Sequence, residues 1–119
     1  MQIQMKRAYD PVADDDGARV LVDRLWPRGL SKEKLKLDHW MKEVAPSHEL
    51  RKWFGHDPDK FEVFSRKYEE ELQSDVAQAQ LIQLIEMAHS GRLTLVYGAK
   101  DETYNQARVL KEIIERQRG

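Results

Sequence analysis

The sequence lacks cysteine altogether: none of its 119 residues is a cysteine. This absence excludes disulfide bonds, thiolate zinc sites and cysteine nucleophiles, and it agrees with a reducing compartment. Long apolar runs are also missing. The segment from Met1 to Lys6 has no signal-like apolar region, and no run approaches the length needed to span a membrane. We therefore expect a cytoplasmic protein without membrane contact.

An excess of charge of one sign is missing as well. The 20 Lys and Arg residues nearly cancel the 21 Asp and Glu residues, which leaves a formal net charge of −1. A dedicated nucleic-acid-binding domain normally has a basic excess, so nucleic acid is a disfavoured partner, although a local basic pocket fits this composition. Repeats, low-complexity stretches and long linkers are absent too. The length is typical of one domain, which we place at 1–119.

The most informative stretch of the sequence runs from Arg19 to Leu30. Within it, Val20–Val22 is a run of three consecutive apolar residues, so both faces of a strand formed here are apolar. Such a run is typical of a parallel sheet that helices cover on both faces. Pro27 lacks a backbone donor and ends the strand, and Gly29 permits a left-handed turn.

Charged side chains follow this predicted strand and allow two interpretations. In the first, Asp23 forms a structural ion pair with Arg24 or Arg28, and the cluster only supports the fold. In the second, the two arginines offer forked donors to a bound anion, with Trp26 between them. The sequence spacing leaves both interpretations open.

The N-terminal region predicts a strand followed by an acidic turn. Residues Gln2 to Tyr9 alternate, with Ile3 and Met5 on the apolar side. The turn at 13–17 contains three adjacent aspartates, and we expect it to be solvated. Three adjacent carboxylates lack the spacing of a calcium-binding loop, so a metal role is disfavoured.

Capping residues predict several helices along the rest of the chain. Aromatic residues at spacings of three and four give the helix over 61–72 an apolar stripe, which is typical of a core position. The helices are expected to begin at Ser31, Asp38 (through Val44), Ser47 (through Phe54, with a stop at Gly55), Asp57 (with Pro58 in the first position), Asp75 (with Gln78 as a capping partner and a stop at Gly91) and Asp101 or Thr103.

A second two-sided apolar run, Leu93–Tyr97, predicts another buried strand. Because helices separate it from the strand at Val20–Val22, the two strands are expected to be parallel. The fold class is therefore α/β, with a small, mostly parallel sheet of three or four strands and helices on both faces. Parallel strands have their carboxyl ends at one edge, where open α/β sheets bind ligands.

This shared edge predicts a cradle for a phosphate or carboxylate group. Gly98 allows a tight turn, and the helix that follows offers free backbone donors, although neither a Walker loop nor a dinucleotide fingerprint is present. The predicted ligand is thus an anionic small molecule, and no cofactor is predicted. The catalytic candidates are Asp23 (as base or orienting group), Arg24 and Lys100. The ligand-binding candidates are Arg24, Trp26, Arg28, Gly29, Tyr97, Gly98, Lys100, Asp101 and Asn105.

The four histidines do not predict a metal site. His39, His48, His56 and His89 lack metal-ligand spacing such as i, i+4 on one helix. His56 is either a general base on a loop or a neighbour of the helix cap at Asp57, and the cap interpretation is favoured.

Several motifs resemble the YeaO-like branch of the domain-of-unknown-function 488 family. The motifs are Asp23-Arg24-Leu25-Trp26-Pro27-Arg28-Gly29, Ala45-Pro46-Ser47 with Leu50-Arg51, and Leu93 to Asp101 with Asn105-Gln106-Ala107. The resemblance covers essentially the whole chain and implies a compact bacterial α/β domain of no established activity. More distant members carry a Cys-His-Arg string near the end of the last core strand, which implies an enzyme or nucleotide handling. Without a cysteine, this chain does not inherit cysteine-dependent chemistry.

Three functional hypotheses follow. The first is an enzyme, or remnant enzyme, that acts on a phosphorylated or nucleotide-like small molecule. The second is a non-catalytic module that binds nucleic acid or a protein partner through the three tryptophans, Trp26, Trp40 and Trp53. The third is a helper without a small ligand, such as a dimer through the helix over 61–72; the sequence does not specify the oligomeric state.

Overall fold

The structure, a computed structural model that describes residues 2–117, is built on one four-stranded parallel sheet. The strand order is β1-β4-β2-β3, and all three pairings are parallel. This confirms the predicted α/β class. The strands are β1 (Gln2–Arg7), β2 (Ala18–Leu21), β3 (His39–Trp40) and β4 (Arg92–Tyr97).

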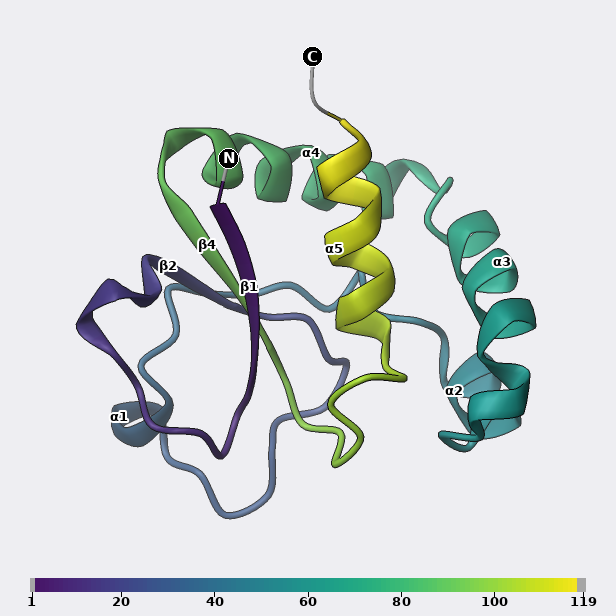
Figure 1. The fold of residues 1–119 in the computed structure, drawn as a ribbon, viewed down its shortest axis with the longest axis horizontal. Helices are drawn as coiled ribbons and strands as arrows, with labels where there is room; N and C mark the ends of the chain where they lie inside the picture. Colours follow the sequence, from purple (N-terminus) through teal and green to yellow (C-terminus); the bar gives the residue numbers. More distant parts are fainter. Residues whose placement is uncertain (1, 118–119) are drawn as a thin grey trace.

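Helices cover both faces of the sheet (Figure 1). Val20, Leu93 and Leu95 face the larger core, which contains apolar side chains of α2 to α5. Leu21 and Val96 face a smaller core closed by Leu35 of α1. The helices are η1 (Asp14–Asp16), α1 (Lys32–Leu35), α2 (His48–Phe54), η2 (Pro58–Lys60), α3 (Phe61–Glu71), α4 (Asp75–Ser90) and α5 (Gln106–Arg116), of which η1 and η2 are 3-10 helices.

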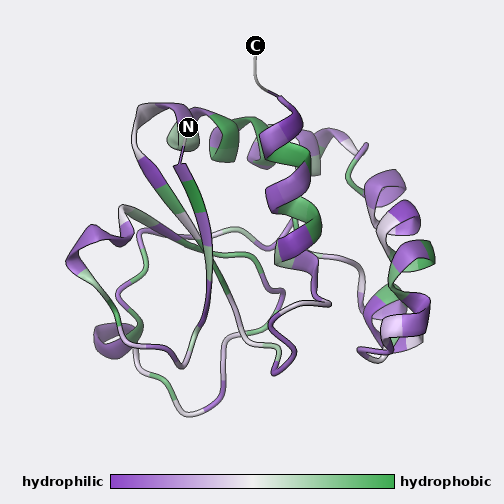
Figure 2. Ribbon diagram, in the orientation of Figure 1, coloured by the Kyte–Doolittle hydropathy of each residue, from purple (hydrophilic) through white to green (hydrophobic). Residues whose placement is uncertain are grey.

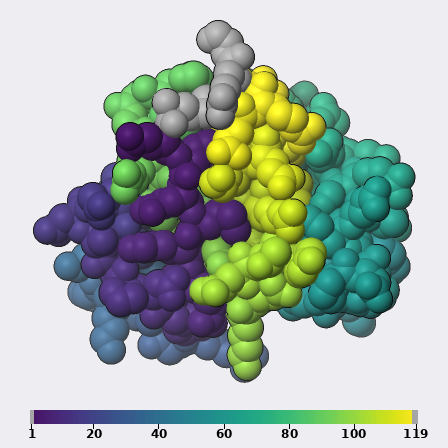
Figure 3. Space-filling view, in the orientation of Figure 1, coloured from purple at the N-terminus to yellow at the C-terminus, as the bar shows by residue number. Residues whose placement is uncertain are grey.

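The helices are amphipathic, as the sequence pattern predicts. Figure 2 shows hydrophobic and hydrophilic stripes alternating along α4 and α5. Leu81 and Leu84 of α4, and Leu110 and Ile114 of α5, are buried in the larger core. Figure 3 shows β1 and α5 side by side at the surface, so α5 supports the sheet from its edge strand. Within the described part of the chain, no helix is both long and apolar enough to cross a membrane.

Three of the six predicted helix N-caps are confirmed. Ser31, Ser47 and Asp57 accept the backbone N–H groups of Lys34, Leu50 and Asp59, respectively. Gly55 ends α2 in the left-handed conformation. Two helix starts differ from the prediction: Ser74 rather than Asp75 caps α4, and Asn105 rather than Asp101 or Thr103 caps α5.

The predicted helix from Asp38 to Val44 is wrong. This segment contains the edge strand β3, whose register pairs Val20 with His39 and Leu21 with Trp40. Asp38 does not cap a helix; its carboxylate accepts the backbone N–H of Arg19 at 2.8 Å. The long-range pairing with β2 therefore outweighs the local i, i+4 spacing of Trp40 and Val44.

The acidic turn is only partly solvated, contrary to prediction. Asp14 and Asp15 are exposed, but Asp16 is only 1% exposed and forms ion pairs with Arg19 at 2.7 Å and Lys6 at 2.8 Å. Burial alone would raise the pKa of Asp16, but hydrogen bonds from Lys6, Ala13 and Arg19 outweigh it, so the pKa is lowered. The third aspartate is thus a core residue.

The aromatic stripe of α3 lies in the core. Phe64, Tyr68 and the following Leu72 are buried, and the Tyr68 hydroxyl donates to the carbonyl oxygen of Val44. Phe64 stacks on Phe54 of α2 with ring centroids 4.2 Å apart. The aromatic stripe of α3 is therefore covered within the same chain, and a dimer through the helix over 61–72 stays a prediction.

Candidate functional site

The register of the sheet brings the two predicted loops together. Leu21 of β2 pairs with Val96 of β4, so two residues further along Asp23 lies beside Gly98. The Gly98 N–H donates to Oδ2 of Asp23 at 2.8 Å. A Cβ atom on Gly98 would lie 3.1 Å from that oxygen, tighter than ordinary contact, so glycine suits this position.

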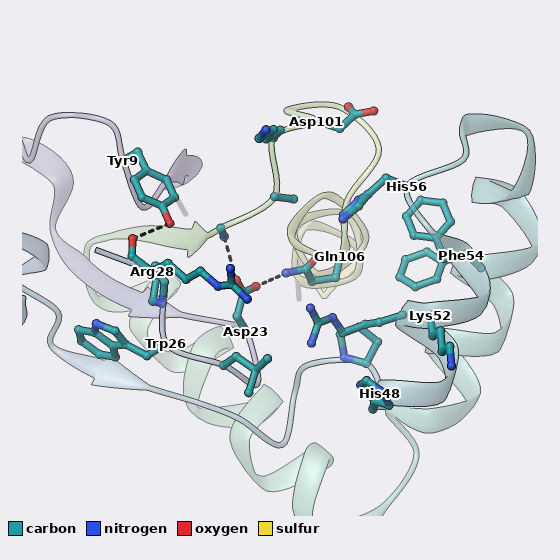
Figure 4. A pocket seen from close by; sticks show the side chains of 18 residues that line it. Tyr9, Asp23, Trp26, Arg28, His48, Lys52, Phe54, His56, Asp101 and Gln106 are labelled. Atoms are coloured by element: carbon teal, nitrogen blue, oxygen red, sulfur yellow. Dashed lines mark hydrogen bonds between the residues drawn. The ribbon is translucent and has the colours of Figure 1, made fainter. Parts of the chain in front are cut away.

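A cleft with a volume of about 790 Å³ opens at this end of the sheet (Figure 4). Ligand sites for small molecules typically have volumes of about 300–1,000 Å³. Six predicted site residues line it: Asp23, Trp26, Arg28, Gly98, Lys100 and Asp101.

Asp23 is a half-buried residue in the lining of the cleft, and in the part of the chain that the structure describes it takes part in no structural ion pair. Its other oxygen, Oδ1, accepts the side-chain amide of Gln106 at the start of α5. Burial raises the pKa of Asp23, whereas the Gly98 N–H and the nearby charge of Arg51 partly offset that rise. Among residues 2–117, Asp23 has no ion-pair partner, so the proposed pairs with Arg24 or Arg28 are wrong.

Arg24 lies outside the lining of the cleft. Its guanidinium donates to the carbonyl oxygens of Pro46 at 3.1 Å and Ala45 at 3.2 Å. The turn before α2 is thereby attached to the loop after β2. The guanidinium also forms a long ion pair with the Glu43 carboxylate, at 3.9 Å. This geometry makes Arg24 a positioning residue for the neighbouring helix.

Three other predicted ligand-binding residues also lie outside the cleft lining. Gly29 has φ +78°, which confirms the predicted left-handed turn. Tyr97 is buried in the larger core, and burial raises its pKa. Asn105 is fully buried, where its side chain caps α5 by accepting the Arg108 N–H and donates to the carbonyl oxygen of Asp101.

The predicted site did not include the side of the cleft that is formed by α2 and by His56, which follows the cap residue Gly55. His48, Arg51 and Lys52 of α2 line the cleft, together with His56. His56 has φ +57°, which is uncommon for a residue with a side chain, and its ring contacts Phe54 edge-on. The favoured interpretation of His56 as only a cap neighbour was therefore incomplete.

Side-chain bonds to the backbone fix the loops around the cleft. The Trp26 indole N–H donates to the carbonyl oxygen of Leu30 at 2.7 Å, and the Tyr9 hydroxyl donates to that of Arg28 at 2.9 Å. The Arg7 guanidinium donates to the Ala99 carbonyl oxygen at 2.9 Å.

The loop after β4 is held by Asp101 as well. Its carboxylate accepts the backbone N–H groups of Tyr104 and Thr103, and these two hydrogen bonds lower the pKa of Asp101. The loops are thus held by contacts that leave most charged groups of the cleft free.

The cleft carries an excess of positive charge in a protein of net charge −1. Four permanent cations line it against two carboxylates, Asp23 and Asp101. The seven ion pairs in the described part of the chain all use other cations. Across residues 2–117, no group of three or more His, Asp and Glu side chains is arranged to hold a metal ion. The cleft cations are Arg28, Arg51, Lys52 and Lys100.

The fold is a small α/β domain with a cleft at the carboxyl ends of its parallel strands, lined by more cations than carboxylates. The chain belongs to the domain-of-unknown-function 488 family, because the model described as "Inactive DUF488-N3 subclade" matches residues 2–118. The chain is 46% identical to "Uncharacterized protein YeaO" of Escherichia coli K12, over 94% of this chain and 96% of that protein.

A mycobacterial relative supports the same assignment. The chain is 38% identical to "Uncharacterized protein Rv3073c" of Mycobacterium tuberculosis, over 95% of this chain and 93% of the relative. No solved structure is significantly similar to the chain. These relatives confirm the resemblance drawn from the sequence motifs.

Proposed function

We propose that this protein binds a phosphorylated small molecule in the cleft between α2 and the loops after β2 and β4, in the cytoplasm. The observation that carries the proposal is the set of four cations without ion-pair partners among residues 2–117. Like charges that line one cleft repel one another, and a bound anion would relieve that repulsion. Guanidinium and ammonium groups are the usual protein partners of phosphate.

Binding without turnover fits the residues better than catalysis. The chain has no cysteine, and the description of its family contains the word "inactive". Asp23, a half-buried carboxylate in the cleft lining, could act as a base, which fits the remnant of an enzyme site. Incubating the protein with a bound phosphate ester, followed by phosphorus NMR, is expected to show no new product.

A small anion fits the site better than a nucleic-acid strand. Stacking on a strand of bases needs free aromatic faces. The Lys42 ammonium lies 4.1 Å from the centroid of the Trp40 ring, and the Trp26 and Trp40 rings meet edge-on with centroids 5.4 Å apart. Lys60 and Lys67 lie over the ring of Trp53. The tryptophans thus already take part in contacts within the chain.

Titration calorimetry with glycerol 3-phosphate and pyrophosphate tests the proposal. We expect both to bind at low salt and to bind more weakly at high salt, because salt screens charge interactions. Arg51→Gln and Lys100→Met are each expected to weaken binding about fivefold, as the loss of one solvent-exposed ion pair predicts.

Lys34→Met is the matched control, because Lys34 is exposed on α1 and does not line the cleft. We expect it to leave both affinities unchanged. The proposal is wrong if the wild-type protein binds neither compound at low salt, or if the control weakens binding as much as the cleft variants.

A further inference from the structure

Asp23 is an unexpected residue in the lining of a site that only has to bind phosphate. A carboxylate repels a phosphate dianion, and burial makes its charge costly. Four cations nevertheless surround the cleft in which this carboxylate lies. Figure 4 shows Arg28 on one side of Asp23, and His48 and Lys52 on the other. The contacts of Asp23 with Gly98 and Gln106 show how much of its side chain the fold uses.

The fold uses only part of the hydrogen-bonding capacity of Asp23. An ionised carboxylate has about four acceptor positions. The Gly98 N–H occupies one on Oδ2, and the Gln106 amide occupies one on Oδ1. Both donors are neutral. Because Asp23 lines the cleft, the remaining acceptor positions are available to a bound molecule.

The carboxylate is also held in a fixed place. Gln106 belongs to the first turn of α5, whose cap Asn105 is fully buried, so its amide is anchored to a rigid element. The backbone of Gly98 approaches Asp23 closely enough to fit only a glycine without adjustment. Two rigid donors on a single acceptor residue are typical of a preorganised recognition group.

We propose that Asp23 selects a phosphorylated ligand that carries hydroxyl groups, such as a polyol or sugar phosphate. This inference rests on the proposed function. The cleft cations would bind the phosphate, and a ligand hydroxyl would donate to the free acceptor positions of Asp23. A cationic donor, such as an ammonium group, is disfavoured because Arg28, Arg51, Lys52 and Lys100 line the same space.

Two ligands with the same carbon number and the same phosphate group test this selection. Glycerol 3-phosphate and n-propyl phosphate differ only in two hydroxyl groups. We expect the wild-type protein to bind glycerol 3-phosphate about tenfold more tightly, as one hydrogen bond to a charged acceptor predicts. Asp23→Asn is expected to bring the ratio close to one. The same variant is expected to bind inorganic phosphate more tightly, because the repulsion is removed.

Asp23→Asn keeps the shape of the side chain, and the Gln106 amide can turn over to accept its new N–H group. Asp75→Asn is the matched control, since Asp75 is exposed at the start of α4 and does not line the cleft. We expect the control to retain the wild-type ratio. If Asp23→Asn does not fold, the affinity ratio of the wild-type protein for glycerol 3-phosphate over n-propyl phosphate tests the selection for hydroxyl groups. A ratio near one overturns this selection, and a tenfold preference supports it.

The outcomes separate this inference from the proposed function. If the wild-type protein binds no phosphate compound, the proposed function is wrong and the selection is wrong with it. If it binds all three compounds without preference, only the selection is wrong. A preference that survives intact in folded Asp23→Asn also overturns the role of Asp23.

Discussion

Single side chains around the cleft divide into two groups by what their polar ends contact. Tyr9, Trp26 and Arg24 donate to backbone carbonyl oxygens, so they fix the loops and the turn before α2. Arg28 and Lys100 line the cleft without a partner in the described part of the chain. Their free charges distinguish these proposed binding residues from the residues that hold the loops in place.

Asp23→Asn is expected to raise the melting temperature at neutral pH by a few degrees. Burial raises the pKa of Asp23 from 3.8, so the folded state favours its protonated form. The stability associated with this group is fully present below pH 3.8 and is lost as the pH rises through the higher folded-state pKa. The uncharged amide of Asp23→Asn does not titrate, so the variant does not lose this stability as the pH rises. The gain over wild type should shrink as the pH falls toward 3.8, which thermal unfolding at a series of pH values measures.

Asp75→Asn is again the control for this prediction, because Asp75 is exposed on α4. A lower melting temperature for Asp23→Asn at neutral pH would contradict it and would mean that Asp23 mainly stabilises the fold. The predicted gain is the usual sign of a residue retained for binding at some cost to stability.

Sequence reasoning identified the cleft residues that directly follow strands. Asp23 and Arg28 come after β2, and Lys100 comes after β4, so the parallel pairing alone predicts that their loops meet. The role of Arg24 could not be predicted from the sequence. Its acceptors, the carbonyl oxygens of Ala45 and Pro46, lie in a turn more than twenty residues away, and no local pattern specifies that contact.

At the scale of elements, the sequence predicted the limits of α2 but not its position. Ser47 and Gly55 mark its ends through local capping chemistry. Its placement beside the cleft depends on the packing of Phe54 against Phe64 and on the Arg24 contacts, which are long-range. β3 shows the same limit, because its two residues become a strand only by pairing with β2.

Ser47→Ala is expected to destabilise the protein by about 1 kcal/mol, the usual cost of losing a helix N-cap. The Ser47 hydroxyl also donates to Glu71 at 2.6 Å, which joins α2 to the end of α3. Because α2 carries Arg51 and Lys52, the variant should bind glycerol 3-phosphate severalfold more weakly. Urea unfolding and calorimetry measure the two effects.

Ser31→Ala provides the matched comparison for the loss of a cap. Ser31 caps α1 through the Lys34 N–H, and no residue of α1 lines the cleft. We expect a similar loss of stability with unchanged affinity. Equal effects of the two serine variants on affinity would show that α2 has no special role in positioning the cations.

At the scale of the whole molecule, one buried aspartate connects three of the four strands. Asp16 pairs with Lys6 of β1 and Arg19 of β2, and its carbonyl oxygen accepts the hydroxyl of Thr94 in β4 at 2.6 Å. Gln4 of β1 donates to both the Asp16 carboxylate and the Thr94 hydroxyl. This network forms at the opposite end of β2 from the cleft, so it stabilises the sheet without contacting the site.

Asp16→Asn is expected to lower the free energy of unfolding at neutral pH by about 3–5 kcal/mol, because it leaves Arg19 buried without its partner. The pKa of Asp16 is lowered from 3.8, so its stabilisation is present above pH 3.8 and is lost as the pH falls through the folded-state value. The variant should therefore lose less stability on acidification than wild type. Urea unfolding at neutral and acidic pH measures both effects. Asp15→Asn is the control, because Asp15 is exposed. If acidification lowers the free energy of unfolding of wild type and Asp16→Asn equally, this network does not have the central role assigned to it.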